Sequence, residues 1–450
     1  MLRRVDSWTR TLRHAKPSSS ESVRLVVERL SHEGRGVVRP GGKVGFVAGA
    51  LPGESIEARL VERHRRFDEY RLLDVVEASP RRVTPACPIV ERCGGCDLQH
   101  LDHDAQLDHK TAVLRELMSR TAGLEPAVPE APLRSPPFGY RRRARLAWHV
   151  PRRGAPRLGF RQAGSREIVA LEACPVLDPV LASLPGRLQP VLASLRRPRQ
   201  LGHVELTVSE SGDGHTWPVL YLHLVEALAA EDRARVAGFA AAEGAYLYLG
   251  LADQRAECVY RPEPQAPGYL LPESGLRLTF EPGDFLQGNA AVNRAMVRRV
   301  VEWLSGDGVR RVVDAFCGLG NFALPLAAAG LAVEGYEGDA ALVDRARRNA
   351  ADLGLDDRAR FSVRDLDADA GLPDGVDAVL LDPPRTGAAA LAAALAARPV
   401  PVVAYVSCAP ATLTRDAAVL AGAGYRLERL AAVDMFPQTA HIEAMALFTR

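Results

Sequence analysis

From about residue 300 onward, short apolar runs alternate with longer segments of helical periodicity. The segment ALVDRARRNAADLG, for example, repeats its apolar residues at the spacing of one helix face. Strands that alternate with helices predict an α/β fold with a doubly wound, mostly parallel sheet. The ligand of such a sheet lies beyond the carboxyl ends of its strands. The predicted strands are RVVDAFCG, LAVEGYEG, ARFSVRDL, DAVLLDPP and VVAYVSCAP.

The first part of the chain has a different pattern, in which short β-rich runs are separated by glycine turns. Short strands at this spacing predict a small barrel of the OB type, an architecture that often binds oligonucleotides. The middle of the chain mixes one helical pattern, 103–122, with strand patterns at 203–210 and 217–226. We therefore divide the chain into a flexible basic tail at 1–20, a barrel at 21–80, a mixed α+β central domain at 81–280 and an α/β domain at 281–450.

Charge is distributed unevenly along the 450 residues, although the net charge is only +2. Between Glu130 and Glu167 there are ten arginines and no acidic residue, with aromatic residues interleaved. Guanidinium groups pair with phosphates and aromatic rings stack on unpaired bases, so this stretch predicts contact with single-stranded RNA. No apolar run reaches about 18 residues, so we expect no membrane span and a cytoplasmic protein.

Polar residues end the predicted strands, where a parallel sheet places its ligand. Glu337 ends the second strand and could accept both hydroxyls of an adenosine ribose, while Asp382 precedes two prolines that stiffen the turn. Cys408 ends the fifth strand just before a predicted helix, whose dipole should lower the pKa of the thiol. Glu443 stands among apolar residues, where desolvation should raise its pKa towards that of a general base; His441 is the alternative base.

Several of these motifs together match one family. The sequence resembles the S-adenosylmethionine-dependent RNA (uracil-5-)-methyltransferases, specifically the 23S ribosomal RNA type with an N-terminal TRAM domain and a [4Fe-4S] cluster. The resemblance runs from about residue 21 to the C-terminus. It rests on FLQGN (285–289), DAFCGLGNFALPLA, DPPR, SCAPATLTRD and DMFPQTAHIE.

The resemblance implies a class I, Rossmann-like methyltransferase domain with Cys408 as nucleophile and Glu443 as base. Uracil C5 is a weak nucleophile, and addition of a thiolate at C6 activates it for methylation. The target uridine must be single-stranded or flipped out of a helix. Ala409 and Gln438 depart from the family pattern and leave substrate preference open. The implied S-adenosylmethionine contacts are Gln287, Phe316, Asn321, Glu337, Asp365 and Asp382.

The resemblance implies that four of the seven cysteines are ligands of one metal centre: Cys87, Cys93, Cys96 and Cys174. Three thiolates in C-x5-C-x2-C spacing and a distant fourth can hold one metal centre. Structural zinc also accepts four thiolates, and the spacing does not separate the two. The resemblance favours an iron-sulfur cluster with an architectural role.

Two alternatives remain open. Within the family, the substrate could be transfer RNA instead of 23S ribosomal RNA. Outside enzymes, the chain could be an inert RNA-binding or ribosome-assembly protein, although the presence of Cys408 and Glu443 argues against this. We expect a monomer.

Overall fold

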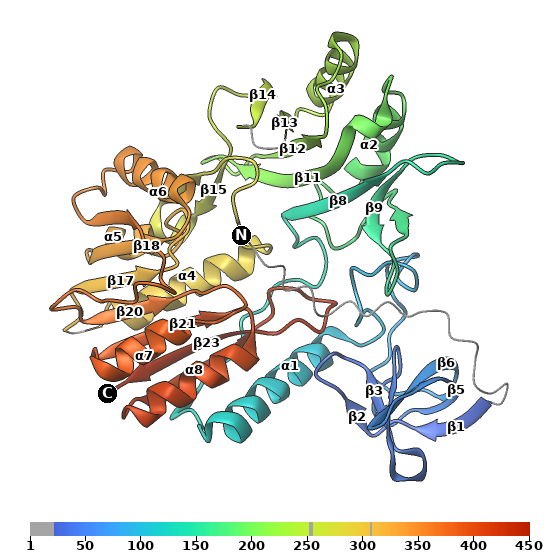
Figure 1. Cartoon of the computed structure of the whole chain (residues 1–450), viewed down its shortest axis with the longest axis horizontal. Helices are drawn as coiled ribbons and strands as arrows, with labels where there is room; N and C mark the ends of the chain where they lie inside the picture. The colour runs from blue at the N-terminus through green and yellow to red at the C-terminus, as the bar shows by residue number, and fades with distance from the viewer. Residues whose placement is uncertain (1–21, 252–254, 307) are drawn as a thin grey trace.

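The computed structural model describes residues 22–251, 255–306 and 308–450. The predicted tail at 1–20 lies outside these residues. Figure 1 shows a small blue β unit, a green central sheet and an orange-to-red α/β unit. No helix in the described part of the chain is long and apolar enough to cross a membrane.

The N-terminal unit has the short strands that the glycine-punctuated pattern predicts, and they form one six-stranded sheet; closure into the predicted OB-type barrel stays a prediction. Its strands pair in the order β1-β5-β6-β4-β3-β2 around a small core that includes Val38, Val47 and Ile56. The strands are β1 (Ser22–Val26), β2 (Arg29–Leu30), β3 (Gly36–Val38), β4 (Val44–Val47), β5 (Ser55–Arg63) and β6 (Phe67–Glu77).

The central sheet has seven strands in the order β10-β9-β8-β11-β12-β13-β14. Side chains of a strand alternate between two faces. The apolar face packs against α2 (Leu184–Ala193) and α3 (Ala230–Ala242), whereas the other face carries polar residues such as Arg145 and Glu205. The strands are β8 (Arg143–His149), β9 (Arg157–Arg161), β10 (Ile168–Ala170), β11 (Leu201–Glu210), β12 (Thr216–Leu224), β13 (Tyr246–Leu251) and β14 (Glu257–Tyr260).

The C-terminal sheet confirms the predicted α/β fold. Its five predicted strands are parallel to one another. Two further strands follow them in the chain and pair antiparallel with each other, and the last of these also pairs antiparallel with the parallel set. In sheet order the strands are β19 (Ala359–Val363), β18 (Ala332–Glu337), β17 (Arg311–Ala315), β20 (Ala378–Leu381), β21 (Val402–Ser407), β23 (Glu443–Thr449), β22 (Arg426–Val433) and β7 (Val128–Pro129). A separate hairpin is formed by β15 (Gly268–Leu271) and β16 (Leu276–Thr279).

Helices cover both faces of this sheet, which gives two hydrophobic cores. Helix α6 shows why the sequence forms them: the Asp339 side chain caps the helix by accepting from Ala341 N at 2.8 Å, and Val343, Ala346 and Ala350 form its buried stripe. One core includes α4 (Ala290–Leu304), α5 (Ala323–Ala328) and α6 (Ala340–Asp352), and the other includes α7 (Ala389–Ala397) and α8 (Pro410–Gly422).

Helix α1 (His103–Leu117) links the central region to the C-terminal sheet. It forms as the helical pattern predicts and continues as a π-helical turn, Met118–Ala122. Val113, Leu114 and Met118 are buried in the same core as α7 and α8. The helix therefore supports the C-terminal unit, although it precedes the central sheet in the chain.

Candidate active site

Four neighbouring strands of the C-terminal sheet bring the predicted site residues to one edge. Glu337 ends β18, Phe316 follows β17, Asp382 follows β20 and Cys408 follows β21, and these strands are neighbours in that order. All four residues line one cavity of about 480 Å³. Because parallel strands point the same way, the predicted row of polar strand ends becomes one wall of a single site.

The cavity lining includes seven of the eight predicted catalytic and cofactor residues and leaves out Asp365. Asp365 is exposed, and its carboxylate accepts from the backbone N–H of Asp367 at 3.1 Å within its own turn. The alternative base His441 is also exposed and outside the lining. The included residues are Gln287, Phe316, Asn321, Glu337, Asp382, Cys408 and Glu443.

Strand register brings Cys408 and Glu443 together across 35 positions of sequence. In the antiparallel pair β21–β23, Ser407 lies opposite Ala444. One step further along this register places Cys408 opposite Glu443, and directly opposed residues have Cβ atoms about 4.5–5.5 Å apart. A thiol and a carboxyl group therefore face the same cavity from neighbouring strands.

The loop after β17 approaches the cavity through an unusual backbone. Phe316 has φ +68°, a conformation rare for a non-glycine residue, and Gly320 has φ +95°. Glu337 supports the loop by accepting from Gly318 N at 3.1 Å. Cys317 is buried against Gly335 within this turn.

Glu443, Asp382 and Cys408 in the cavity hold their protons more tightly than usual. Burial, with the nearby Asp382 carboxylate, raises the pKa of Glu443 to about 8. Burial and Glu337 raise the pKa of Asp382 to about 7. The prediction for Glu443 is thus confirmed.

The prediction of a lowered Cys408 pKa is wrong for this structure. Burial is the largest cause of a raised pKa of the thiol, and the carboxyl groups of Glu443 and Asp382 add to it. Arg385 acts in the opposite direction but does not reverse the shift. Burial and two acidic neighbours therefore outweigh the start of the following helix.

The loop between β22 and β23, residues 434–442, leads directly to Glu443 and is held from outside the C-terminal sheet. Lys110 on α1 is buried and donates to Asp434 Oδ1 at 2.6 Å and to Phe436 O at 3.1 Å. His103 Nε2 lies 2.9 Å from Asp434 Oδ2. These contacts fix the first half of the loop to α1.

The second half of the loop is fixed at Gln438, which has φ +69°. Gln106 of α1 accepts from its backbone N–H at 2.8 Å and donates to its side chain at 3.1 Å. Asp97, next to Cys96, accepts from Ala440 N at 2.7 Å. The loop conformation therefore depends on residues more than 300 positions earlier in the sequence.

The four predicted metal-ligating cysteines line one pocket between the segment 87–99 and the residues around Cys174. Three of them are buried and Cys96 is half-buried. Burial, with the neighbouring thiols, raises the pKa of Cys96 to about 12. Four thiols that share one pocket would repel one another as thiolates, so a bound cation is the natural way to ionise them.

Some functional residues were missed by sequence reasoning. Arg385 lines the cavity, and its place in DPPR was a signal for it. Tyr269 also lines the cavity and donates to Asn321 Oδ1 at 2.9 Å. Nothing in the local pattern around Tyr269 or Lys110 indicates a site, because only the folded chain brings them there.

Comparison with known proteins agrees with this geometry. The family described as tRNA (Uracil-5-)-methyltransferase matches residues 273–450. The 23S rRNA (uracil(1939)-C(5))-methyltransferase RlmD of Pseudomonas aeruginosa (strain UCBPP-PA14) is 46% identical over 432 residues, 94% of this chain and 93% of that protein. The protein of the same description from Shewanella halifaxensis is 41% identical, over 96% of this chain and 98% of its own length.

A solved structure is similar over almost the whole fold. The Pyrococcus abyssi tRNA (uracil-54, C5)-methyltransferase in complex with S-adenosyl-L-homocysteine has a TM-score of 0.72 and 25% identity to this chain. The match covers 95% of this chain and 100% of that one.

Proposed function

Because the chain belongs to the S-adenosylmethionine-dependent RNA (uracil-5-)-methyltransferases, we propose that its substrate is a uridine of 23S ribosomal RNA. The observation that carries this substrate is the 46% identity to a 23S rRNA (uracil(1939)-C(5))-methyltransferase over 94% of the chain. Transfer RNA is the second candidate, because the similar Pyrococcus abyssi enzyme acts on tRNA.

We propose Cys408 as the nucleophile and Glu443 as the base. The Cys408 thiolate adds to C6 of uracil, and the electron pair moves onto C5 and the O4 carbonyl. C5 then takes the methyl group, whose bond to the donor sulfur breaks. Glu443 removes the proton from C5, the C5–C6 double bond re-forms, and the C6–S bond breaks to release Cys408. Cys408 directly follows β21, Glu443 begins the neighbouring strand β23, and both line the same cavity, which supports this division of roles.

The raised pKa values fit these roles only when Glu443 has lost its proton. A carboxyl group with a pKa of about 8 is a stronger base than an ordinary glutamate and is better matched to a carbon acid. The Cys408 thiol must also ionise, and the Arg385 guanidinium in the cavity favours the thiolate. Turnover should therefore rise with pH through about 8.

The methyl donor fits the part of the cavity formed by the β17 loop and β18. S-adenosylmethionine supplies an electrophilic methyl group on a sulfonium. We propose that Glu337 accepts from the ribose hydroxyls, because two backbone N–H groups, of Gly318 and Asp339, already fix its orientation at 3.1 Å each. Gln287, Phe316, Asn321 and Asp382 line the same space. Asp365 stays a predicted contact.

For the cysteine pocket we propose a [4Fe-4S] cluster in preference to zinc. Four sulfurs around one zinc ion, at Zn–S distances of about 2.3 Å, lie only about 3.8 Å apart. Among the described residues, no three of these four sulfurs come within 4.8 Å of one another. A pocket lined by all four thiols at wider spacing supports a larger centre.

We propose that the barrel at 21–80 and the arginine-rich stretch hold the RNA. Seven of the ten arginines in that stretch are exposed, including Arg145, Arg153 and Arg157. Arg142 is an exception, because it is buried, lies over the Tyr269 ring and donates to Gln287 O at 2.8 Å. It supports the cavity wall and is not available to phosphates.

A trapping experiment tests this function. The full protein is incubated with the methyl donor and 5-fluorouridine-substituted 23S rRNA or tRNA, and covalent adducts are mapped by mass spectrometry. Fluorine cannot leave as a proton does, so we expect an adduct at Cys408 with 23S rRNA and none with Cys408→Ala. An adduct that forms only with tRNA would show that tRNA, and not 23S rRNA, is the substrate. The absence of an adduct at Cys408 with either RNA would overturn the mechanism.

A further inference from the structure

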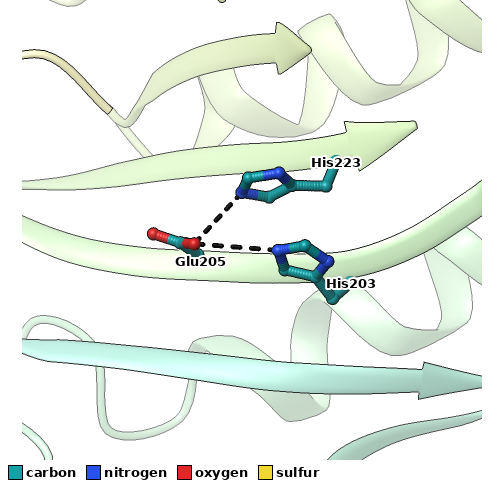
Figure 2. A group of neighbouring side chains, drawn as sticks. All are labelled: His203, Glu205 and His223. Carbon is teal, nitrogen blue, oxygen red and sulfur yellow. Dashed lines mark ion pairs between the residues drawn. The ribbon is translucent and has the colours of Figure 1, made fainter. Parts of the chain in front are cut away.

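A group of three side chains outside the cavity and the cysteine pocket converges on one point of the central sheet. His203 and Glu205 lie on β11, and His223 lies on the neighbouring strand β12. Strand pairing places His203 directly opposite His223. Figure 2 shows both imidazoles with a ring nitrogen directed at the Glu205 carboxylate. The group is on the face of the sheet that α2 and α3 leave uncovered.

Both imidazoles form ion pairs with Glu205 when they are protonated, but neither Nε2 atom has the geometry of a hydrogen bond. His223 Nε2 lies 3.2 Å and His203 Nε2 lies 3.7 Å from Glu205 Oε1. Both Nε2 atoms are buried, and neither has a hydrogen-bond partner among the described residues. Buried polar atoms usually have hydrogen-bond partners. Two buried Nε2 atoms without such partners, beside one carboxylate oxygen, therefore indicate that a group bound between them is missing.

The distances suit a metal ion. Two ligands of a tetrahedral zinc ion at about 2.0–2.1 Å are about 3.4 Å apart, between the two observed nitrogen–oxygen separations. The three ligand atoms of the group lie within 4.8 Å of one another. The centroids of the stacked imidazole rings are 3.7 Å apart, so both rings must turn about their side-chain bonds to share an ion.

The surroundings of Glu205 favour ligation through one oxygen. Arg143 Nη2 donates to Oε2 at 3.0 Å, which orients the carboxylate and leaves Oε1 facing the histidines. Carboxylate ligands in metal sites commonly have such a supporting hydrogen bond. Arg145 Nη2 lies 3.3 Å from His203 Nδ1, but its side chain is exposed and can move away when Nδ1 carries the proton.

We propose that His203, Glu205 and His223 form a binding site for one divalent zinc-class ion, separate from the four-cysteine centre. Two imidazoles and one carboxylate suit borderline ions such as Zn²⁺ and leave one coordination position for water. The site would join β11 to β12. Through Arg143, which also lies 3.5 Å from Gly283 O, it would contact the loop before Phe285 and Gln287 of the cavity.

Zinc stoichiometry and ligand type test the site in the full, iron-loaded protein. The chain is equilibrated with ZnCl₂, and zinc and iron are measured separately by mass spectrometry. We expect about one zinc per chain in the wild type and at least about tenfold weaker zinc binding in His223→Asn and Glu205→Gln, with iron unchanged. His215→Asn, an exposed histidine between β11 and β12, is the matched control and should bind zinc as the wild type does.

X-ray absorption at the zinc edge distinguishes this site from the cysteines. Nitrogen and oxygen ligands at about 2.0–2.2 Å support the proposal, whereas a sulfur shell at about 2.3 Å overturns it. Equal zinc content in the wild type and His203→Asn/His223→Asn also overturns it. Thermal unfolding without zinc shows whether each variant is folded, and in the folded variants zinc should no longer raise the melting temperature.

Discussion

Asp434 and Glu443 are buried carboxyl groups nine positions apart in one motif, yet the structure gives them opposite properties. Burial alone would raise the pKa of Asp434, but His103 and Lys110 hold that pKa below its usual value. No cation in the described part of the chain forms an ion pair with Glu443, and burial and the Asp382 carboxylate raise its pKa to about 8. A buried cation thus makes Asp434 a permanent anion and structural anchor, whereas Glu443 keeps the raised pKa that suits the base we propose.

The two ends of this loop differ in what they contact. The Asp434 end faces α1, where Lys110 supplies a fixed positive charge. The Glu443 end faces the cavity, where the proposed base must lose and regain a proton during turnover. Lys110 also lowers the pKa of Glu443, although by less than burial raises it. The two ends are therefore electrostatically linked.

The largest expected effect comes from removing the base. Glu443→Gln should lower turnover by about 10²–10⁴-fold, the usual contribution of a general base. If Glu443 acts only after methyl transfer, the methylated Cys408–RNA adduct should accumulate in this variant and be visible as a band of retarded mobility on a denaturing gel. Turnover within a fewfold of the wild type would show that Glu443 is not the base.

Removing Lys110, the cation that pairs with Asp434, should mainly lower the stability of the folded protein. Lys110→Met leaves Asp434 buried without its lysine partner and should lower the free energy of unfolding by about 3–5 kcal/mol, measured by chemical denaturation. It should also move the rise of the pH–rate profile to higher pH, because Lys110 lowers the pKa of Glu443.

Lys43 provides the matched control, since it pairs with Asp68 at the same 2.6 Å but is about one-third exposed. Lys43→Met should change stability by less than about 1 kcal/mol and leave the pH–rate profile unchanged. Similar effects of Lys110→Met and Lys43→Met on stability would mean that burial does not make the Lys110–Asp434 ion pair more important than the Lys43–Asp68 pair.

The raised pKa of Glu443 predicts a pH dependence of stability. Between its unfolded pKa near 4.5 and its folded pKa of about 8, the folded state holds a proton that the unfolded state has lost. Stability therefore falls as pH rises through this window, by a few kcal/mol at most. Denaturation of Glu443→Gln from pH 5 to pH 8 should show a shallower fall than the wild type, and parallel curves would contradict the shift.

The smallest effect should come from a carboxyl group that has neither burial nor a role in the cavity lining. Asp365→Ala should raise the KM for S-adenosylmethionine by a fewfold at most, because Asp365 is exposed and outside the lining. Glu337→Ala, measured in parallel, should raise this KM much more. A large effect of Asp365→Ala would restore it as a cofactor contact.

Local patterns predicted much of this molecule. The five parallel strands, helix α6 and the polar strand ends follow from periodicity, since a parallel sheet buries its strands and exposes their carboxyl ends. Seven of the eight predicted catalytic and cofactor residues line one cavity, and four of them stand at or just after the ends of parallel strands. The raised pKa of Glu443 was predictable from its apolar neighbours.

The rest required contacts between distant segments. The Cys408 pKa depends on acidic groups from β20 and β23, so the helix after Cys408 was a misleading guide. Lys110 and Gln106 belong to an ordinary amphipathic helix, and only its packing against α8 and β22 brings them to loop 434–442. The metal-site proposal depends likewise on strand register.

The sequence by itself determined the order of strands and helices and the residue types at the strand ends, because periodicity and turn chemistry act over a few residues. Tertiary structure alone decided which buried charges have partners. Electrostatic energy depends on separation in space and on burial, so the contrast between Asp434 as an anchor and Glu443 as the proposed base arises only when α1 and β21 are in place.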